Sequence, residues 1–293
     1  MNPDHSHLTP ATAELLAASD SERIILIQEE RWITFPRVRV ALEALEALLA
    51  RPRTTRMRSI AIYADSGMGK TMLMERFKRA HLAVYNETER RSVTPVIALQ
   101  MPTHATERRF YGHLLTEIGV PFVSRATILD LETQALRSLK RMDVKLLMLD
   151  EVHNILAGSA KEQRILLNTL RYISNELKIS LVCFGISEAR EAISGDVQLA
   201  RRIEELPLMR WQGNEEFQEL IVAILRHLPL KLASQISARA LRHVLQSTDG
   251  VTAQIFGMFN DLAVEAIRSG TECIADENIE AWRPSTQATP AFA

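Results

Sequence analysis

The stretch YADSGMGKTML, residues 63–73, combines two glycines, a lysine and a threonine between two regular segments. The run before it, residues 58–64, is short and apolar, which is typical of a buried β-strand. The residues after it, 70 to about 85, are predicted to form a helix. A glycine-rich turn that joins a strand to a helix N-terminus gathers backbone N–H groups and the positive end of the helix around one point. The stretch is therefore either an anion-binding loop or an ordinary glycine turn followed by Lys-Thr.

The loop matches the Walker A pattern, except that Ala64 stands where the pattern has its first glycine. The glycines of this motif let backbone N–H groups surround a polyphosphate. Lys70 would reach the β- and γ-phosphates of ATP, and Thr71 would offer its hydroxyl to Mg²⁺. The alanine is a mild departure, since its methyl group still permits a tight turn. The predicted ATP-binding residues are Ala64, Asp65, Ser66, Gly67, Met68, Gly69, Lys70 and Thr71.

A second apolar run, residues 144–151, ends in two acids, Asp150 and Glu151. At the carboxyl edge of a parallel sheet, Asp150 can hold the Mg²⁺ shell. Glu151 can polarise an attacking water as a general base, which separates hydrolases from small-molecule kinases. The alternative is a strand followed by an ordinary acidic loop. The order of the two motifs along the chain favours an ATP-hydrolysing site, in which Lys70 also contributes to catalysis.

Strand candidates alternate with helical segments through the middle of the chain. Further apolar runs cover residues 94–101, 179–185 and 204–209. This alternation predicts an α/β fold, a P-loop NTPase whose parallel sheet is covered by helices on both faces. After residue 214 only helical patterns follow, which predicts a C-terminal all-α lid.

The predicted organisation has five parts. They are a flexible N-terminal arm (1–20), a helical lead-in (21–57), an α/β nucleotide-binding domain (58–212), a helical lid (213–283) and a flexible tail (284–293). The arm is polar and contains two prolines, whereas residues 21–50 show apolar side chains at helical spacing.

The composition argues against several classes of protein. Hydrophobic residues make up 46% and charged residues 24% of the 293, as in ordinary soluble proteins. With a net charge of -1, contact with nucleic acid must come from a local patch. The two cysteines, Cys183 and Cys273, form no CxxC, so neither a disulfide framework nor a cysteine zinc site is expected. No secretory pattern and no apolar run of ~18 residues occurs, so we expect a cytoplasmic protein without a membrane anchor.

The predicted helical lid points to the AAA+ class of P-loop ATPases, whose members act as rings or filaments with nucleotide between neighbours. A neighbouring subunit then supplies an arginine that stabilises the negative charge on the γ-phosphate. Arg202 is the predicted finger in trans, with Arg201 as the alternate, in the segment DVQLARRIEELPL. Two solvent-facing arginines are the other interpretation. Ser187, just after the fourth strand, is predicted to sense the γ-phosphate, and a helix N-cap is equally open there.

Several segments together resemble the TniB family of AAA+ transposition ATPases, relatives of TnsC. They are the lead-in ERWITFPRVRVALEALEALLARP, the Walker segments SIAIYADSGMGKT and LLMLDEVHNIL, and the stretches VCFGISEA and QLARRIEELPL. The resemblance covers roughly residues 21–270. Walker motifs are shared by many ATPases, so the specific weight falls on the lead-in and on the last two stretches.

The resemblance implies an accessory ATPase in DNA transposition. Such proteins bind double-stranded DNA with little sequence preference and form homo-oligomers on it with ATP, as rings or filaments. They recruit a DDE transposase, often together with a TniQ-like partner, and hydrolysis disassembles the oligomer. This sequence departs from the general pattern at Ala64 and at Gln254, near where many relatives carry a sensor arginine. We therefore expect slow or partner-stimulated hydrolysis.

The predicted DNA contacts follow the second strand of the sheet, at Thr103, His104, Arg108 and Arg109. Phosphate contacts without base readout would give salt-dependent, sequence-tolerant binding. A solvated helix face is the alternative for these residues. The histidines 104, 113 and 153 lack a metal-binding spacing and are interpreted as ordinary polar residues.

Three other functions stay open. The first is another AAA+ DNA loader, IstB-like or initiator-like, which shares the ATPase core and delivers a different partner. The second is a STAND-type nucleotide switch, which holds nucleotide tightly and needs no DNA. The third is a small-molecule kinase, against which Glu151 and the predicted lid argue.

Overall fold

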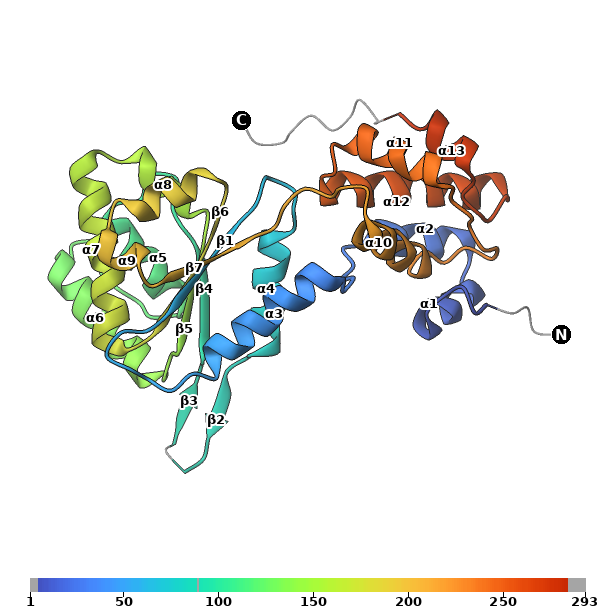
Figure 1. Cartoon of the computed structure of the whole chain (residues 1–293). Helices are drawn as coiled ribbons and strands as arrows, with labels where there is room; N and C mark the ends of the chain where they lie inside the picture. The colour runs from blue at the N-terminus through green and yellow to red at the C-terminus, as the bar shows by residue number, and fades with distance from the viewer. Residues whose placement is uncertain (1–4, 89, 284–293) are drawn as a thin grey trace. The chain divides into compact units, whose positions relative to one another are not determined.

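The computed structural model describes residues 5–88 and 90–283 and divides into two compact units (Figure 1). The α/β unit is Arg37–Met209. The helical unit combines the residues up to Pro36 with those from Arg210 onward. The expected lead-in, residues 21–57, is thus shared between the two units. The expected tail, residues 284–293, lies outside the described residues.

The α/β unit is built on a five-stranded parallel sheet in the order β4-β5-β6-β1-β7. Its strands are β1 (Ser59–Tyr63), β4 (Val96–Gln100), β5 (Leu146–Asp150), β6 (Ser180–Gly185) and β7 (Ile203–Pro207). Each lies within two residues of a strand predicted from the sequence. The central strands β1, β5 and β6 are buried along their whole length, as their continuous apolar runs require.

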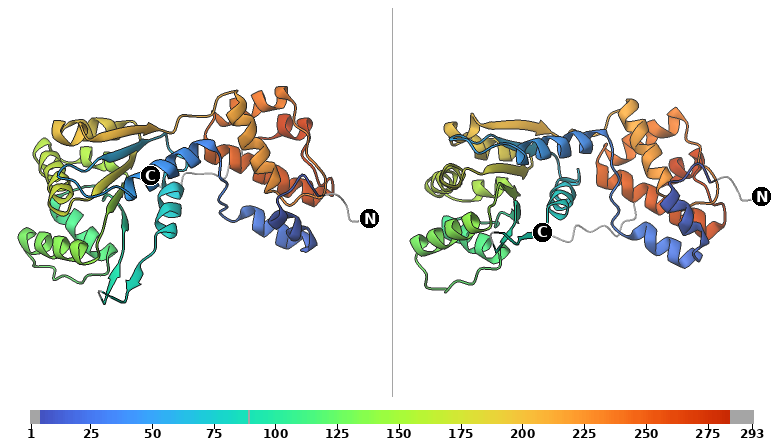
Figure 2. Two further views of the ribbon diagram at one scale, coloured as in Figure 1. Left: turned by 60° about the horizontal axis from the view of Figure 1, so that its bottom comes forward. Right: turned by 90° about the horizontal axis from the view of Figure 1, so that it is seen from below.

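Side chains alternate between the two faces of this sheet, and each face is covered by helices (Figures 1 and 2). Odd-numbered strand residues such as Ala61, Leu149 and Leu181 join one core cluster with Phe110 and Leu170. On the other face, α4 packs against β4, β5 and β6. The helices of this unit are α3 (Pro36–Leu49), α4 (Lys70–Ala80), α5 (Glu107–Glu117), α6 (Ile128–Arg141), η2 (Val152–Ala157), α7 (Ala160–Leu177), α8 (Glu188–Ser194) and α9 (Val197–Ala200).

A short antiparallel hairpin, β2 (Val84–Asn86) with β3 (Arg91–Val93), follows α4 (Figure 1). The prediction that this helix continues to residue 85 is therefore wrong. The helix ends at Ala80, and Leu82, Val84 and Tyr85 are exposed. Because these apolar side chains meet no core, burial does not extend the helix, and their β-branched and aromatic character favours a strand.

The helical unit brings the two ends of the described chain together. Its elements are α1 (Pro10–Glu14), η1 (Leu15–Ala17), α2 (Asp20–Gln28), α10 (Glu215–Arg226), α11 (Ala238–Thr248), α12 (Thr252–Ser269) and α13 (Asp276–Ala281). Helix α2 packs against α12, as Figure 2 also shows. Ile27, Phe217, Ile255 and Phe259 are almost completely buried. The helical C-terminal region predicted from the sequence is present.

The N-terminal segment differs from the expected flexible arm over its described residues. Thr9 accepts a hydrogen bond from the backbone N–H of Thr12 and caps α1, with Pro10 at the first helical position. Leu8 is buried, and the Thr9 backbone N–H donates to the Arg226 carbonyl oxygen at 3.0 Å. A cap, a proline at N1 and one buried leucine thus anchor a segment whose polar composition suggested a loose arm.

The helical run expected over residues 21–50 is also interrupted. Helix α2 ends at Gln28, and α3 begins at Pro36. Proline has no N–H and restricts the residue before it, so it starts a helix more readily than it continues one. The aromatic-proline step of the lead-in is therefore one of the two places where the chain passes from one unit to the other, the second being at Met209–Arg210.

Candidate functional site

The predicted phosphate loop, residues 64–69, lies between the carboxyl end of β1 and the first residue of α4. Gly67 and Gly69 have φ angles of 77° and 89°, in the left-handed region that glycine occupies without strain. Gly69 is the N-cap of α4 and makes no side-chain cap bond. The first-turn N–H groups of α4, which have no partner within the helix, therefore face the loop. Backbone donors and the helix dipole are both available there for an anion.

Ala64 adopts the position of the missing glycine without a left-handed backbone. It is absent from the residues with positive φ, and its side chain is buried. Its N–H donates to the Gly185 carbonyl oxygen at 3.0 Å, which ties the loop to β6. The first glycine of the pattern is thus replaceable here, because the chain turns sharply only at the two later glycines.

Lys70 is buried, with 6% of its surface exposed. Its ammonium group donates to the carbonyl oxygens of Ala64 at 2.7 Å and Asp65 at 3.0 Å. Burial lowers the pKa of Lys70, and the charges of Glu151, Asp150 and Asp65 oppose that shift. The lysine is therefore folded over the loop in a region of negative charge, where a phosphate chain can replace the carbonyls as acceptor.

Thr71 and Asp150 meet across the sheet edge. The Thr71 hydroxyl donates to Asp150 Oδ2 at 2.8 Å, and Asp150 is 98% buried at the end of β5. The other carboxylate oxygen, Oδ1, accepts the Glu151 backbone N–H at 2.9 Å. A hydroxyl oxygen and a carboxylate oxygen at this distance fit Mg²⁺, which takes few protein ligands and keeps several waters.

Glu151 has a left-handed backbone, with φ 55° and ψ 42°. Such a conformation costs about 1–3 kcal/mol for a residue with a Cβ and concentrates at functional sites. Its carboxylate is partly exposed and lies 3.1 Å from Nε2 of His153. From the sequence, His153 is interpreted as an ordinary polar residue, because it belongs to no metal-binding spacing. Its place two residues after the catalytic candidate was the available signal.

Ser187 is exposed at the start of α8, after the end of β6. Its hydroxyl donates to Glu188 Oε2 at 2.8 Å and makes no helix-cap bond. The Ser187 hydroxyl therefore does not cap α8. A serine beyond the carboxyl end of β6 lies on the same sheet edge as the phosphate loop, because β6 is parallel to β1.

Arg201 and Arg202 lie at the opposite edge of the sheet. Arg202 precedes β7, and its carbonyl oxygen accepts the backbone N–H of Ser59, the first residue of β1. The phosphate loop follows the last residue of β1, about 16 Å away at ~3.3 Å per residue. The Arg202 guanidinium donates to Asn175 Oδ1 at 2.6 Å, whereas Arg201 is exposed. Neither arginine completes the site of its own chain.

Four predicted DNA contacts cluster around the start of α5, and they differ in how they are held. The Arg108 guanidinium donates to the carbonyl oxygens of Ala126 and Ser124, both at 2.6 Å, and so braces the loop before α6. Arg109 is exposed and donates to the His104 carbonyl oxygen at 3.3 Å. Thr103 and His104 are exposed. Arg108 therefore has a structural task of its own.

The family model described as "Bacterial TniB protein" matches residues 23–213, which include the whole phosphate site and both arginines. The chain belongs to the TniB family. No curated protein matches it.

Solved structures show which fold this TniB-family chain has. The ORC2 protein of Aeropyrum pernix, in ADPNP and ADP complexes, aligns with a TM-score of 0.61 and 18% identity, covering 87% of this chain and 69% of that one. The ORC1 protein of the same organism, in complex with DNA, aligns with a TM-score of 0.60 and 16% identity, covering 88% of this chain and 67% of that one. CDC6p of Pyrobaculum aerophilum aligns with a TM-score of 0.61 and 15% identity, covering 89% of this chain and 69% of that one. The predicted AAA+ P-loop fold is confirmed.

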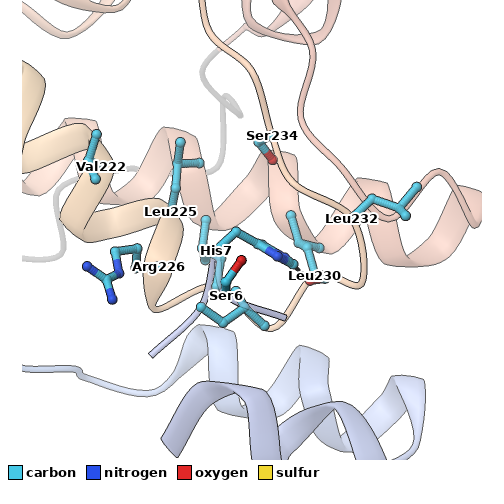
Figure 3. A pocket seen from close by; sticks show the side chains of 10 residues that line it. Ser6, His7, Val222, Leu225, Arg226, Leu230, Leu232 and Ser234 are labelled. Carbon is cyan, nitrogen blue, oxygen red and sulfur yellow. Dashed lines mark hydrogen bonds between the residues drawn. The ribbon is translucent and has the colours of Figure 1, made fainter. Parts of the chain in front are cut away.

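A cavity of about 310 Å³ in the helical unit is lined mainly by leucines, with Ser6 and His7 along one side (Figure 3). His7 Nε2 lies at 3.1 Å from the Leu230 carbonyl oxygen, and Arg226 is at the rim. This lining contains no arrangement of acid, base and nucleophile. Within residues 5–88 and 90–283, every helix of this TniB-family chain is too short or too polar to span a lipid bilayer.

Proposed function

We propose that this TniB-family protein is an ATP-dependent, DNA-binding regulator of transposition. It would form an oligomer on target DNA and recruit a DDE transposase, with a TniQ-like protein as a further partner. The observation that carries the proposal is the group formed by Lys70, Thr71, Asp150 and Glu151 at one sheet edge. Family membership supports the transposition role, because the resemblance to TniB proteins implies it and the matched region spans the lead-in as well as all four residues.

In the proposed reaction, water attacks the γ-phosphorus of ATP and the bond to the β–γ bridging oxygen breaks. The N–H groups of the loop and of the first turn of α4 bind the phosphates. Lys70 turns from the loop carbonyls to the β- and γ-phosphate oxygens, and its charge offsets theirs. Glu151 accepts the proton of the attacking water.

Magnesium is the cofactor that the site fits, with Thr71 and Asp150 as its protein ligands. When bound, Mg²⁺ neutralises charge on the phosphate oxygens. Asp150 is held for this role by its burial and by the backbone N–H of Glu151. Ser187, on the same sheet edge, is the proposed sensor of the γ-phosphate.

Arg202 is the proposed finger for a neighbouring subunit, with Arg201 as the alternate. Its position at the far edge of the sheet supports action in trans, because the site of its own chain is out of reach. The bond to Asn175 would then break when a neighbour presents its nucleotide. Hydrolysis would thus depend on assembly.

DNA binding is proposed to use exposed side chains near the start of α5, led by Arg109 with Thr103 and His104. Since the chain has a net charge of -1, the contact must be local and sensitive to salt. Arg108 would act indirectly, through the loop that it braces.

Another AAA+ DNA loader of the initiator type is the second candidate. The observation in its favour is the similarity to ORC and CDC6 structures, one of which was solved with DNA. At 15–18% identity this similarity reaches no further than the fold. A STAND-type switch, which needs no DNA, is the third.

The test measures affinity and complex size on random-sequence duplex DNA without nucleotide and with ADP, ATP or a non-hydrolysable analogue. We expect large complexes with ATP or the analogue and small ones with ADP, and binding that weakens steeply with salt. Arg109→Gln should weaken the DNA contact, whereas Arg239→Gln, on an exposed face of the helical unit, should not.

Absence of DNA binding in every nucleotide state would overturn the DNA part of the proposal and favour the switch. Nucleotide-dependent DNA assembly without capture of the transposase of the same element would favour the loader. Capture of that transposase by the assembled form alone would support the transposition role.

A further inference from the structure

The imidazole of His153 stands beside the carboxylate proposed to activate water. His153 lies in η2, directly after β5, and its Nε2 is 3.1 Å from Oε2 of Glu151. An ionised carboxylate has only acceptor sites. At this distance the facing nitrogen must therefore carry the proton, since two lone pairs would repel each other.

The other ring nitrogen indicates which form of the imidazole is present. Among the described residues, Nδ1 of His153 is buried without a hydrogen-bond partner. A buried N–H without an acceptor is rarer and costs more than a buried acceptor without a donor. The neutral ring with its proton on Nε2 satisfies both sides, because it leaves only a lone pair at Nδ1.

The surroundings of the ring leave it little freedom. A Cβ atom built at Gly185 would lie 3.6 Å from Nδ1 of His153 and only 2.5 Å from Cβ of Ala189. Gly185, at the end of β6, thus lets α8 approach closely. The imidazole ring of His153 lies next to this glycine. The helix η2, which carries His153, contacts both β6 and α8, the helix that follows Ser187.

Glu151 needs such a partner. Its backbone is left-handed, and the hydrogen bond from its own N–H goes to Asp150, so neither directs the carboxylate. We propose that His153 is a positioning residue, which donates from Nε2–H to the Glu151 carboxylate and orients it toward the attacking water. This inference rests on the proposed ATP hydrolysis and assigns to it a residue that neither Walker pattern specifies.

Two matched substitutions separate this role from a packing role. In His153→Gln the amide nitrogen can reach the place of Nε2, whereas in His153→Asn it reaches only the place of Nδ1. We expect kcat for ATP to fall by about tenfold to a hundredfold in His153→Asn, as for a small misplacement of a reacting group. His153→Gln should recover most of it. KM and the affinity for a fluorescent ATP analogue should stay near wild type in both.

Equal loss in the two variants, or no loss in either, would overturn the proposal. So would weakened nucleotide binding in His153→Asn, which would indicate a role in the pocket itself. In a Glu151→Gln background, His153→Asn should cause no further loss of kcat, because His153 acts through Glu151. A further loss would contradict that.

A second readout needs no hydrolysis. In the full-length, nucleotide-free protein labelled with ¹⁵N-histidine, NMR shifts should show His153 as the neutral Nε2–H form. Glu151→Ala should alter that signal, whereas Glu162→Ala, which removes the acid beside His104, should not. A proton on Nδ1 in the wild type would overturn the proposal. If the wild type hydrolyses no ATP but shows the Nε2–H signal, the proposed function fails and the contact stands.

Discussion

Each unit of this protein buries a long cation, and the two cations have different partners. In the helical unit, Arg23 donates to both carboxylate oxygens of Glu272 at 2.6 and 2.8 Å, to Asp20 at 2.7 Å and to the Pro229 carbonyl oxygen at 2.7 Å. In the α/β unit, Lys70 donates to two carbonyl oxygens of the phosphate loop.

The pKa values of the two cations move in opposite directions. The hydrogen bonds with Glu272 raise the pKa of Arg23, whereas burial lowers the pKa of Lys70. Within the helical unit the charge is neutralised, so it fixes α2 to the segment after α12. In the phosphate loop the positive charge of Lys70 is disfavoured by burial, and a bound phosphate would offset that cost. The same kind of residue is thus structural in one unit and, as proposed, functional in the other.

Glu151→Gln tests the functional side of this comparison with the largest expected effect. Hydrolysis of ATP should fall by about 10²- to 10⁴-fold, because the amide cannot accept the proton of the attacking water. Binding of ATP and DNA should persist, so that an ATP-bound oligomer accumulates. Single-turnover hydrolysis, with complex size measured in parallel, checks this. Hydrolysis at the wild-type rate would show that Glu151 is not the base.

Arg23→Met tests the structural side. The substitution leaves the Glu272 carboxylate largely buried without its main partner, and breaking a buried pair costs about 3–5 kcal/mol. Urea unfolding followed by tryptophan fluorescence measures it, because Trp32, Trp211 and Trp282 all lie in the helical unit.

The control for Arg23 is Arg239→Met, which breaks the more exposed pair with Glu280. That change should cost less than about 1 kcal/mol. Nucleotide affinity should be unchanged in both variants. Equal losses of stability in Arg23→Met and Arg239→Met would mean that the buried network stabilises the fold no more than an exposed ion pair does.

Acid should remove the same stabilisation. The bonds from Arg23 lower the pKa of Glu272 from 4.5 to about 2. A carboxyl group with a lowered pKa in the folded state stabilises it fully above its ordinary pKa, and the contribution is lost as the pH falls toward 2. The shift corresponds to roughly 3 kcal/mol. In urea titrations, the stability difference between wild type and Glu272→Gln should shrink between pH 5 and about pH 2, and a constant difference would contradict this account.

Lys70→Met should change the stability only slightly, within about 1 kcal/mol. Loss of two hydrogen bonds to carbonyls is offset because the folded protein no longer buries a charge that it disfavours. All four tyrosines (63, 85, 111 and 172) lie in the α/β unit, so ¹⁹F NMR of fluorotyrosine follows its unfolding. A loss comparable with that of Arg23→Met would erase the contrast between the two units.

The sequence predicted the parallel sheet because its signals are local. The apolar runs of β1, β5 and β6 are continuous, and glycine and lysine follow β1 at fixed spacing. The hairpin after α4 escaped prediction because Val84 and Tyr85 pack against no core, so no periodicity marks it. The buried network of Arg23 escaped because Glu272 is 249 residues away along the chain.

The phosphate site divides in the same way. The contact of Thr71 with Asp150 followed from the rule that parallel strands end at a common edge. The contact of His153 with Glu151 did not, because no rule of strand order fixes the directions of these two side chains beyond the end of β5. Arg108 is predicted to contact DNA, and the structure adds that it holds a loop, which its charge alone could not reveal.

The most direct test of the central claim, that the α/β unit binds ATP through Lys70, is the ATP affinity of Lys70→Met beside that of Lys78→Met. Both lysines lie on α4, but Lys78 pairs with Glu117 at a partly exposed site. We predict that Lys70→Met binds ATP on the order of 100-fold more weakly, through loss of charge-assisted hydrogen bonds to phosphate, and that Lys78→Met binds as the wild type does. Wild-type affinity in folded Lys70→Met would contradict the account.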